Sequence, residues 1–325
     1  MKKIILSAIV FVGAMTLNAQ DEAPKLSISG TVDAYYQTYL TASDDVSGSF
    51  GTSFADEAGF ALGMANLVLS YDGEKTGVVA DLVYGPRGDS AAGGYNLNQL
   101  YAYWNVSEST TLTAGRFNTY LGYEVISPAG NFNYSTSYLF SSGPFSHVGL
   151  KADFALSEDF SLMLAVMNPT DTNNNTTGDY GFGAQLGYAG QYLNLYYDND
   201  SVLGFEIDYT GGFDLSESFF LGINGAYQVS DDAGFYGAAL YPQLTTSDSF
   251  SIGLRGELFG LHAKDVDDLP SVFATTLTGS YTVENLTIKP EVRLDSWSDN
   301  EPYVDADGVA SESLAAFTIA AIYSF

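Results

Sequence analysis

The chain has 325 residues and no cysteine, and 39 acidic residues against 11 basic ones give it a formal net charge of −28. This charge repels phosphate backbones and excludes a nucleic-acid-binding role. The lack of cysteine excludes a small exported domain stapled by disulfides. The 24 Tyr, 21 Phe and 34 Gly instead suit strands and tight turns.

The first residues have the pattern of a secretory signal peptide. Lys2 and Lys3 form a positive region, residues 4–15 form an apolar stretch, and Leu17-Asn18-Ala19 is typical of a cleavage site. The apolar stretch is too short to cross roughly 30 Å of hydrocarbon as a helix. We expect residues 1–19 to be removed on export, which leaves residues 20–325 as one domain.

From Lys25 onward, apolar and polar residues alternate with a period of two, which predicts strands. No later stretch approaches the twenty apolar residues of a membrane-spanning helix. The alternation predicts sixteen strands, at about 25–40, 59–72, 76–85, 96–107, 109–118, 146–157, 159–168, 179–189, 191–199, 202–215, 218–229, 234–246, 248–259, 271–283, 285–297 and 313–325.

The links between these strands fall into two alternating classes. Every second link is tight, such as Asp72–Lys75, Ser157–Asp159 and Glu284–Asn285, whereas the others are mostly long and polar, such as Thr41–Ala58 and Asn118–Phe145. Short turns on the periplasmic side and long loops on the extracellular side are typical of an outer-membrane β-barrel, and we expect that arrangement here. The sequence therefore predicts an all-β fold, a single antiparallel transmembrane barrel of about sixteen strands.

Several strands separate charged residues from apolar ones on opposite faces. In 285–297, Leu286, Ile288, Val292 and Leu294 share one face. Charges facing lipid cost about 2–4 kcal/mol near the bilayer midplane, so the charged faces should point into the lumen, where they need water or a fully paired network. The predicted lumen charges are Arg116, Lys151, Asp153, Glu206, Asp208, Arg255, Glu257, Lys289, Glu291, Arg293 and Asp295, with Asp33 and Asp81 as further acids.

The last strand ends on alternating apolar residues that include Tyr323 and Phe325. This ending is similar to the carboxy-terminal signal that the barrel-assembly machinery reads. It predicts that machinery and outer-membrane lipid as partners.

The segment from Gly115 to Phe154 resembles the β-barrel porin family called porin-2 or OmpL-like, which is common in Bacteroidetes and relatives. The resembling positions are Gly115, Arg116, Gly122, Glu124, Asn131, Tyr134, Ser135, Ser137, Phe140, Pro144, His147 and Gly149. The resemblance implies an outer-membrane porin, without a defined solute. Thr136 departs from the pattern, because a basic residue is expected there, and this weakens any anion-attracting role for the segment.

Residues 118–145 form the third long loop. In general porins of sixteen strands this loop folds into the lumen, so the resemblance implies a constriction there, with an aromatic cap on the barrel mouth as the alternative. The residues that would line it are Tyr120, Tyr123, Glu124, Phe132, Tyr134, Tyr138 and Phe140. Lumen arginines and acids would then either create a transverse field that orients solutes or simply pair along a wet wall.

The sequence gives little support for an enzyme. Only His147 and His262 could serve a catalytic triad, and neither has a recognisable nucleophile nearby in sequence. Two acidic groups, Asp265, Asp267 and Asp268, or Asp305, Asp307 and Glu312, could bind Ca²⁺, but neither has EF-hand spacing. We expect no enzyme, no cofactor and no metal site.

The sequence thus predicts an exported outer-membrane porin for passive diffusion of small hydrophilic solutes or ions. The excess of acids in the lumen and loops predicts modest cation selectivity, and a homotrimer is a possible assembly. The alternative is a surface-binding or adhesin barrel without an open channel, which long acidic loops would serve equally well.

Overall fold

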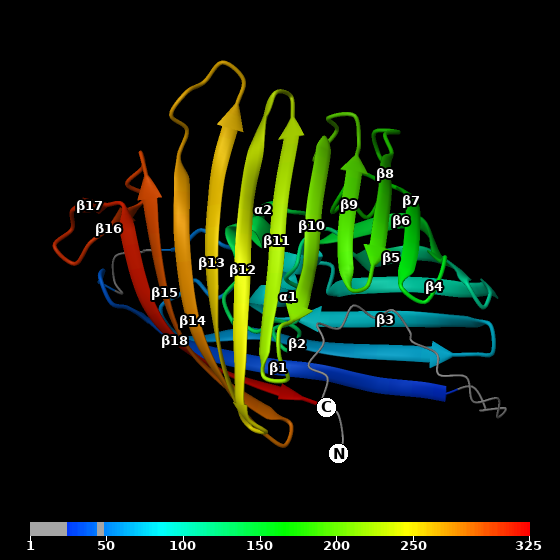
Figure 1. Cartoon of the computed structure of the whole chain (residues 1–325), viewed down its shortest axis with the longest axis horizontal. Helices are drawn as coiled ribbons and strands as arrows, with labels where there is room; N and C mark the ends of the chain where they lie inside the picture. Colours follow the sequence, from blue (N-terminus) through cyan, green and yellow to red (C-terminus); the bar gives the residue numbers. More distant parts are fainter. Residues whose placement is uncertain (1–24, 44–48) are drawn as a thin grey trace.

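The computed structural model describes residues 25–43 and 49–325, so the predicted signal peptide and cleavage site lie outside the described residues. Sixteen of the described strands form one closed antiparallel barrel, which confirms the predicted fold (Figure 1). They are β1 Lys25–Tyr39, β2 Gly59–Asp72, β3 Thr76–Tyr84, β4 Leu97–Ser107, β5 Thr110–Asn118, β6 Ser146–Ala155, β7 Phe160–Met167, β8 Gly181–Tyr188, β9 Gln191–Tyr197, β10 Phe205–Asp214, β11 Phe219–Ser230, β12 Ala233–Ser247, β13 Phe250–Ala263, β14 Ser271–Val283, β15 Leu286–Ser298 and β18 Ser313–Ser324.

The barrel is closed by β1 and β18, the first and last of these strands. Tyr36 pairs with Ile319, and the amide and carbonyl of Phe325 exchange hydrogen bonds of 3.0 Å with those of Gly30. Closure removes the unpaired edges that a sheet would otherwise present to lipid.

The outer and inner faces of each strand follow the alternation in the sequence. On β15, Val292 and Leu294 are exposed on the outside, whereas Glu291, Arg293 and Asp295 are buried on the inside. An apolar exterior with charges inside is the arrangement that a hydrocarbon layer requires.

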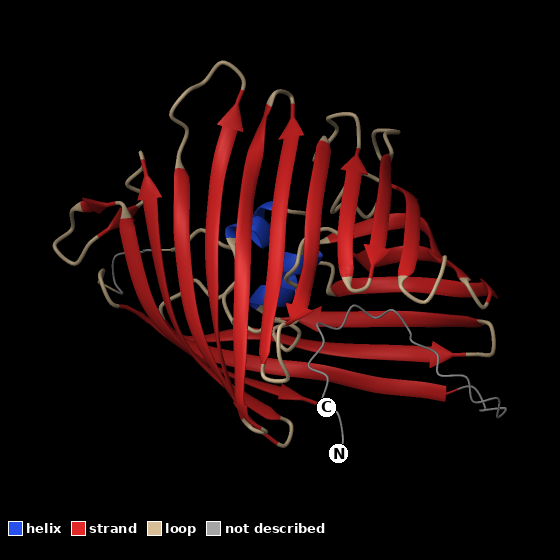
Figure 2. Cartoon of the chain, in the orientation of Figure 1, coloured by secondary structure: helices blue, strands red, loops and turns tan. Residues whose placement is uncertain are grey.

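The barrel interior also holds chain segments that are not strands. Helices α1 (Pro86–Ala92) and α2 (Tyr138–Ser142) lie within the ring of strands, as Figure 2 shows in blue. A small hairpin, β16 (Tyr303–Val304) and β17 (Ala310–Ser311), belongs to the link between β15 and β18. Among the described residues, no helix is both long and apolar enough to span a membrane.

Candidate functional site

The link between β5 and β6, residues 119–145, folds into the barrel and is called the inner loop below. Four glycines on the wall leave room for its side chains. A Cβ atom at Gly222 would lie 2.2 Å from the Tyr123 hydroxyl oxygen, and one at Gly253 would lie 2.5 Å from the Phe132 ring. Gly183 and Gly237 face Tyr120 and Leu139 in the same way. The wall is therefore shaped to seat this loop.

Wall carboxylates accept hydrogen bonds from the backbone of the inner loop. Glu291 accepts hydrogen bonds from the backbone amides of Tyr134 and Ser135 at 2.8 and 3.1 Å. Glu257 accepts hydrogen bonds from the backbone amides of Tyr138 and Leu139 at 3.0 and 2.8 Å. These amides have no strand partner, because the segment runs through the lumen. All four oxygen atoms of these two carboxylates accept hydrogen bonds from the loop, and both residues are at most 2% exposed.

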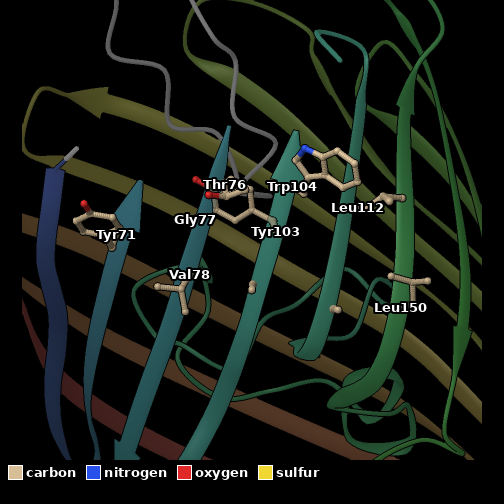
Figure 3. Close-up of a pocket in the computed structure, with 10 residues that line it drawn as sticks. Tyr71, Thr76, Gly77, Val78, Tyr103, Trp104, Leu112 and Leu150 are labelled. Atoms are coloured by element: carbon tan, nitrogen blue, oxygen red, sulfur yellow. The ribbon is translucent and has the colours of Figure 1, made fainter. Parts of the chain in front are cut away.

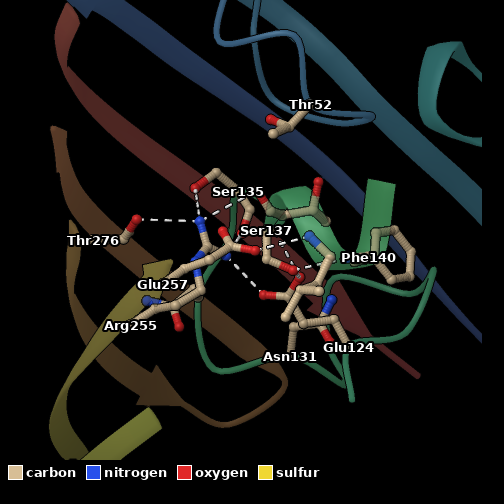
Figure 4. Close-up of polar contacts among 12 residues, drawn as sticks. Thr52, Glu124, Asn131, Ser135, Ser137, Phe140, Arg255, Glu257 and Thr276 are labelled. Atoms are coloured by element: carbon tan, nitrogen blue, oxygen red, sulfur yellow. Dashed lines mark hydrogen bonds and ion pairs between the residues drawn. The ribbon is translucent and has the colours of Figure 1, made fainter. Parts of the chain in front are cut away.

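Wall bases donate to the carbonyls of the same loop. Arg255 donates to the Ser135 carbonyl at 2.7 Å and the Thr136 carbonyl at 3.2 Å, and it pairs with Glu124 at 2.7 Å (Figure 4). Lys289 donates to the carbonyls of Pro128 and Asn131. The charges of β13 and β15 thus form a network around the inner loop, and few of their polar atoms remain for a passing solute.

Two loop tyrosines extend this network. Tyr134 donates to Asp33 at 2.5 Å, and Tyr138 donates to Asp295 at 2.7 Å, where Asp295 also pairs with Arg293. Burial raises the pKa of Tyr134 and that of Tyr138 well above the ordinary value for tyrosine. Both hydroxyls therefore stay protonated and act as donors to the wall acids.

The wall opposite this network remains partly open. Lys151 and Asp153 on β6 pair with each other at 2.8 Å, and their side chains are 25% and 40% exposed. Every other predicted lumen charge is at most 8% exposed. Among the predicted lumen charges, this pair alone is therefore presented to solvent.

The remaining predicted lumen charges occupy separate positions on the wall. Arg116 contacts the carbonyls of Asn98 and Ala91 and the side chain of Asn173. Asp81 accepts hydrogen bonds from the side-chain amides of two asparagines. Glu206 and Asp208 lie on β10 beside the inner loop.

The structure places the predicted constriction residues inside the barrel, on the inner loop. Tyr123 stacks on Tyr241 of β12 with ring centroids 4.3 Å apart. Phe140 packs against Phe54 with ring centroids 5.7 Å apart. Glu124 accepts hydrogen bonds from the backbone amide and the hydroxyl of Ser137, the residue that caps the N-terminus of α2. The loop is ordered by both polar and aromatic contacts with the wall.

Sequence reasoning missed two further segments inside the lumen. From the link between β1 and β2, Phe50 and Phe54 are buried, and Thr52 accepts a hydrogen bond from Arg293 at 3.0 Å. From α1, buried Arg87 donates to the Tyr134 carbonyl at 3.2 Å. Pro86 directly before Arg87 was the one sequence signal for a helix start there.

A hollow of about 570 Å³ lies against the barrel wall, on strands β2 to β6 (Figure 3). Its lining includes Val78, Trp104 and Leu150, which are 43–51% exposed on the outer, lipid-facing side of their strands. Apolar side chains at that face suit acyl chains, so the hollow is not part of the lumen site.

The two histidines lack the partners of a catalytic triad in the described part of the chain. His147 shares a hydrogen bond of 2.9 Å with Thr119, and its Nδ1 has no partner among the described residues, whereas His262 contacts the Gln228 carbonyl. Residues 25–43 and 49–325 also contain no group of three or more His, Cys, Asp or Glu placed to hold a metal ion.

Comparison with known proteins gives one family and a set of similar folds. The family described as "beta-barrel porin-2, OmpL-like" matches residues 25–325. No curated protein matches the sequence.

Three solved structures of similar fold are outer-membrane proteins. The outer membrane channel DcaP of Acinetobacter baumannii is 13% identical, with a TM-score of 0.61 over 94% of this chain and 99% of that one. The trimer form of OmpT of Vibrio cholerae is 10% identical, with a TM-score of 0.53 over 94% and 100%. A mutant of the Rh. blastica porin is 14% identical, with a TM-score of 0.54 over 93% and 100%. At these identities, the similarity shows the fold.

Proposed function

The chain belongs to the beta-barrel porin-2, OmpL-like family of outer-membrane barrels, and we propose that it is a porin for passive diffusion of small hydrophilic solutes. The observation that carries this proposal is the combination of an apolar outer surface with a lumen lined by polar groups. Near the tight-turn end, neutral polar side chains on the lumen face stay partly or fully exposed, among them Ser29, Ser70, Gln185, Thr245 and Thr282. Such a wall can replace the hydration of a small polar solute.

The path that we propose runs along the open side of the lumen. Lys151, Asp153 and Gln185 lie on β6 and β8, away from the network on β13 and β15. The inner loop narrows the lumen from the opposite wall. We propose that Tyr120, Tyr123 and Phe132 form the edge of this constriction, because these loop residues are only half-buried.

One observation favours the second candidate, a surface-binding barrel without an open channel. Three links enter the lumen from the long-loop end, through residues 49–58, through α1 and through the inner loop. A lumen filled over its full cross-section would leave only the outer loops for function. Current through a planar bilayer separates the two candidates.

We propose that the protein is modestly selective for cations. This selectivity arises at the barrel mouth, since the inner loop covers most of the lumen charges. Exposed acids crowd the long links, and Lys264, itself paired with Asp232, is one of very few bases there. The exposed acids include Asp200, Asp231, Asp232, Asp265, Asp267, Asp268, Asp299, Glu301 and Asp307. Their field enriches cations at the entrance, and salt screens it beyond about 8 Å at physiological ionic strength.

A zero-current potential under a KCl gradient should show K⁺ preferred over Cl⁻, most clearly at low salt. Replacing Asp265, Asp267 and Asp268 by Asn should reduce that preference, because these exposed acids contribute to the field at the mouth. Anion preference at low salt in the wild-type protein would show that the bases of the lumen dominate instead. The matched control replaces acids of the opposite end, Glu158 and Asp159, by Gln and Asn, and we expect a smaller change there.

Tyr323 and Phe325 form the proposed assembly signal, with the barrel-assembly machinery as its reader. Both are about half exposed on the outer face of the barrel, and the backbone of Phe325 closes the ring against Gly30. Phe325→Asp should sharply lower the amount of heat-modifiable barrel in the outer membrane. Phe325→Tyr is the control that keeps an aromatic end. Normal levels of the Asp variant would contradict this role.

Assembly as a homotrimer is part of the proposal, since a protein of the same fold is described in a trimer form. The mass of the detergent-solubilised protein, measured by light scattering with detergent correction, should equal three chains. A mass of one chain would contradict it.

A further inference from the structure

Two tyrosines on the lumen face lie over wall glycines near the tight-turn end of the barrel. Tyr103 of β4 covers Gly77 of β3, where an added Cβ atom would lie 2.3 Å from the tyrosine ring. Tyr192 of β9 covers Gly187 of β8, where an added Cβ atom would lie 3.0 Å from the ring. Both tyrosine side chains stay partly exposed. Each ring therefore rests one face on a glycine and presents the other face to the lumen.

The exposed ion pair of the lumen, Lys151 and Asp153, lies on the wall between these tyrosines. Tyr103 pairs across the sheet with Thr113 of β5, and Thr113 pairs with Lys151 of β6, so all three share the lumen face. Tyr192 lies on β9, three strands beyond β6. Neighbouring strands are about 4.8 Å apart, so β6 lies about 10 Å from β4 and about 14 Å from β9. An aromatic ring therefore flanks the ion pair on each side.

The ion pair keeps hydrogen-bonding capacity and carries no net charge. Lys151 donates to Oδ2 of Asp153 at 2.8 Å, which leaves ammonium donors of Lys151 and the Oδ1 atom of Asp153 available to a solute. Gln185 adds a partly exposed amide on the same face, since it pairs across the sheet with Met163 and Met163 pairs with Asp153. A neutral solute with two adjacent hydroxyls can accept from Lys151 and donate to Asp153 while the ion pair stays intact.

We propose that this stretch of wall binds carbohydrate, which, resting on the proposed porin function, makes sugars the solute class of the channel. The site consists of Tyr103, Lys151, Asp153, Gln185 and Tyr192. A sugar ring carries hydroxyls on its rim and C–H groups on its faces, so it fits polar groups placed between exposed aromatic faces. A singly charged solute finds no net counter-charge here, and a zwitterion must break the 2.8 Å ion pair to reach both charges.

The test is saturation-transfer NMR on the purified full-length barrel, which detects weak binding of a small solute and needs no current. The detergent is lauryldimethylamine oxide, because a detergent with a sugar headgroup would compete for the site. The probes are maltose, cellobiose, lactose and sucrose, and triethylene glycol is the control solute, since it has neither a ring face nor a row of hydroxyls. We expect saturable transfer to at least one sugar and none to triethylene glycol. A wild-type barrel that binds none of the four sugars would overturn the site.

Tyr103→Ala and Tyr192→Ala should each raise the dissociation constant of the bound sugar by about three- to tenfold, the scale of one lost aromatic contact. Tyr103→Phe keeps the ring and should stay within about twofold of the wild type. The matched control is Trp104→Ala, because Trp104 is the next residue along β4 but lies on the lipid face. Unchanged binding in both tyrosine-to-alanine variants would overturn the site, and so would an equal loss in the Trp104 variant. Heat-modifiable migration shows that each variant is folded.

A zwitterion is the competing ligand of the ion pair, and glycylglycine is its probe. Transfer to glycylglycine without transfer to any of the four sugars would assign the wall to zwitterions and overturn the carbohydrate site. The outcome is separable from that of the porin proposal. Sugar binding in a barrel that carries no current would support the site while contradicting the porin, and current steps without sugar binding would do the reverse.

Discussion

Deletion of residues 127–142 should raise the single-channel conductance by roughly twofold or more, because conductance follows the free cross-section of a pore. The deleted segment contains α2 and the loop amides that bind Glu257 and Glu291. The barrel should still form, since its closure rests on strand pairing between β1 and β18. Single-channel recording in planar bilayers measures the effect.

The control for this deletion removes residues 265–268 from the link between β13 and β14. These residues are exposed at the barrel mouth, so their loss should leave the lumen cross-section unchanged. An inner-loop deletion that folds, yet conducts no better than this control, would show that the loop does not limit permeation.

Arg255→Met should release the inner loop from the wall. Arg255 is fully buried and makes five hydrogen bonds, of which four reach the loop residues Glu124, Ser135 and Thr136. Its removal leaves Glu124 buried without a counter-charge, and breaking a buried pair in this way costs about 3–5 kcal/mol. Amide hydrogen exchange at residues 134–140 should accelerate by roughly a hundredfold or more.

Lys151→Met provides the contrast, because Lys151 and Asp153 form a partly exposed pair. Partly exposed pairs contribute at most about 1 kcal/mol, so exchange in the inner loop should hardly change. Similar exchange rates in the two variants would mean that the buried network does not hold the loop.

The strands of the barrel could be predicted from sequence because each face meets a different environment. Lipid on one side and polar groups on the other impose a strict alternation, and this is plain in β15, where Val292 and Leu294 flank Arg293. The bounds predicted for β2 and β14 agree with the structure at both ends. The tight turns were equally clear, since hairpin turns of two to four residues leave little choice of path.

The interior could be predicted only in part, because its contacts join residues that are far apart in the chain. Arg255 and Glu124 are 131 positions apart, and Glu291 and Tyr134 are 157 apart. Alternation placed these wall residues on the inner face but could not show what covers them. The sequence left open whether lumen charges meet water or a paired network, and the structure shows a network on β13 and β15.

The inward path of residues 49–58 had no sequence signal. Phe50 and Phe54 lie in a polar, glycine-containing segment that reads as an ordinary outer loop. They are buried because they pack against other aromatic rings of the interior and because Arg293 and Arg87 present their guanidinium groups to the two rings, at 4.3 and 4.4 Å from the ring centroids. Such pairings depend on the assembled barrel, not on the local pattern of residues.

The current through planar lipid bilayers containing the purified wild-type protein is the most direct test of the porin proposal. We expect discrete and steady current steps in KCl, because the partly exposed side chains of Lys151, Asp153 and Gln185 form the wall of the polar path that we propose beside the inner loop. Heat-modifiable migration in gels establishes that the protein in the sample is folded. A folded barrel that inserts into the bilayer and yields no current steps would contradict the porin proposal and favour the closed, surface-binding barrel.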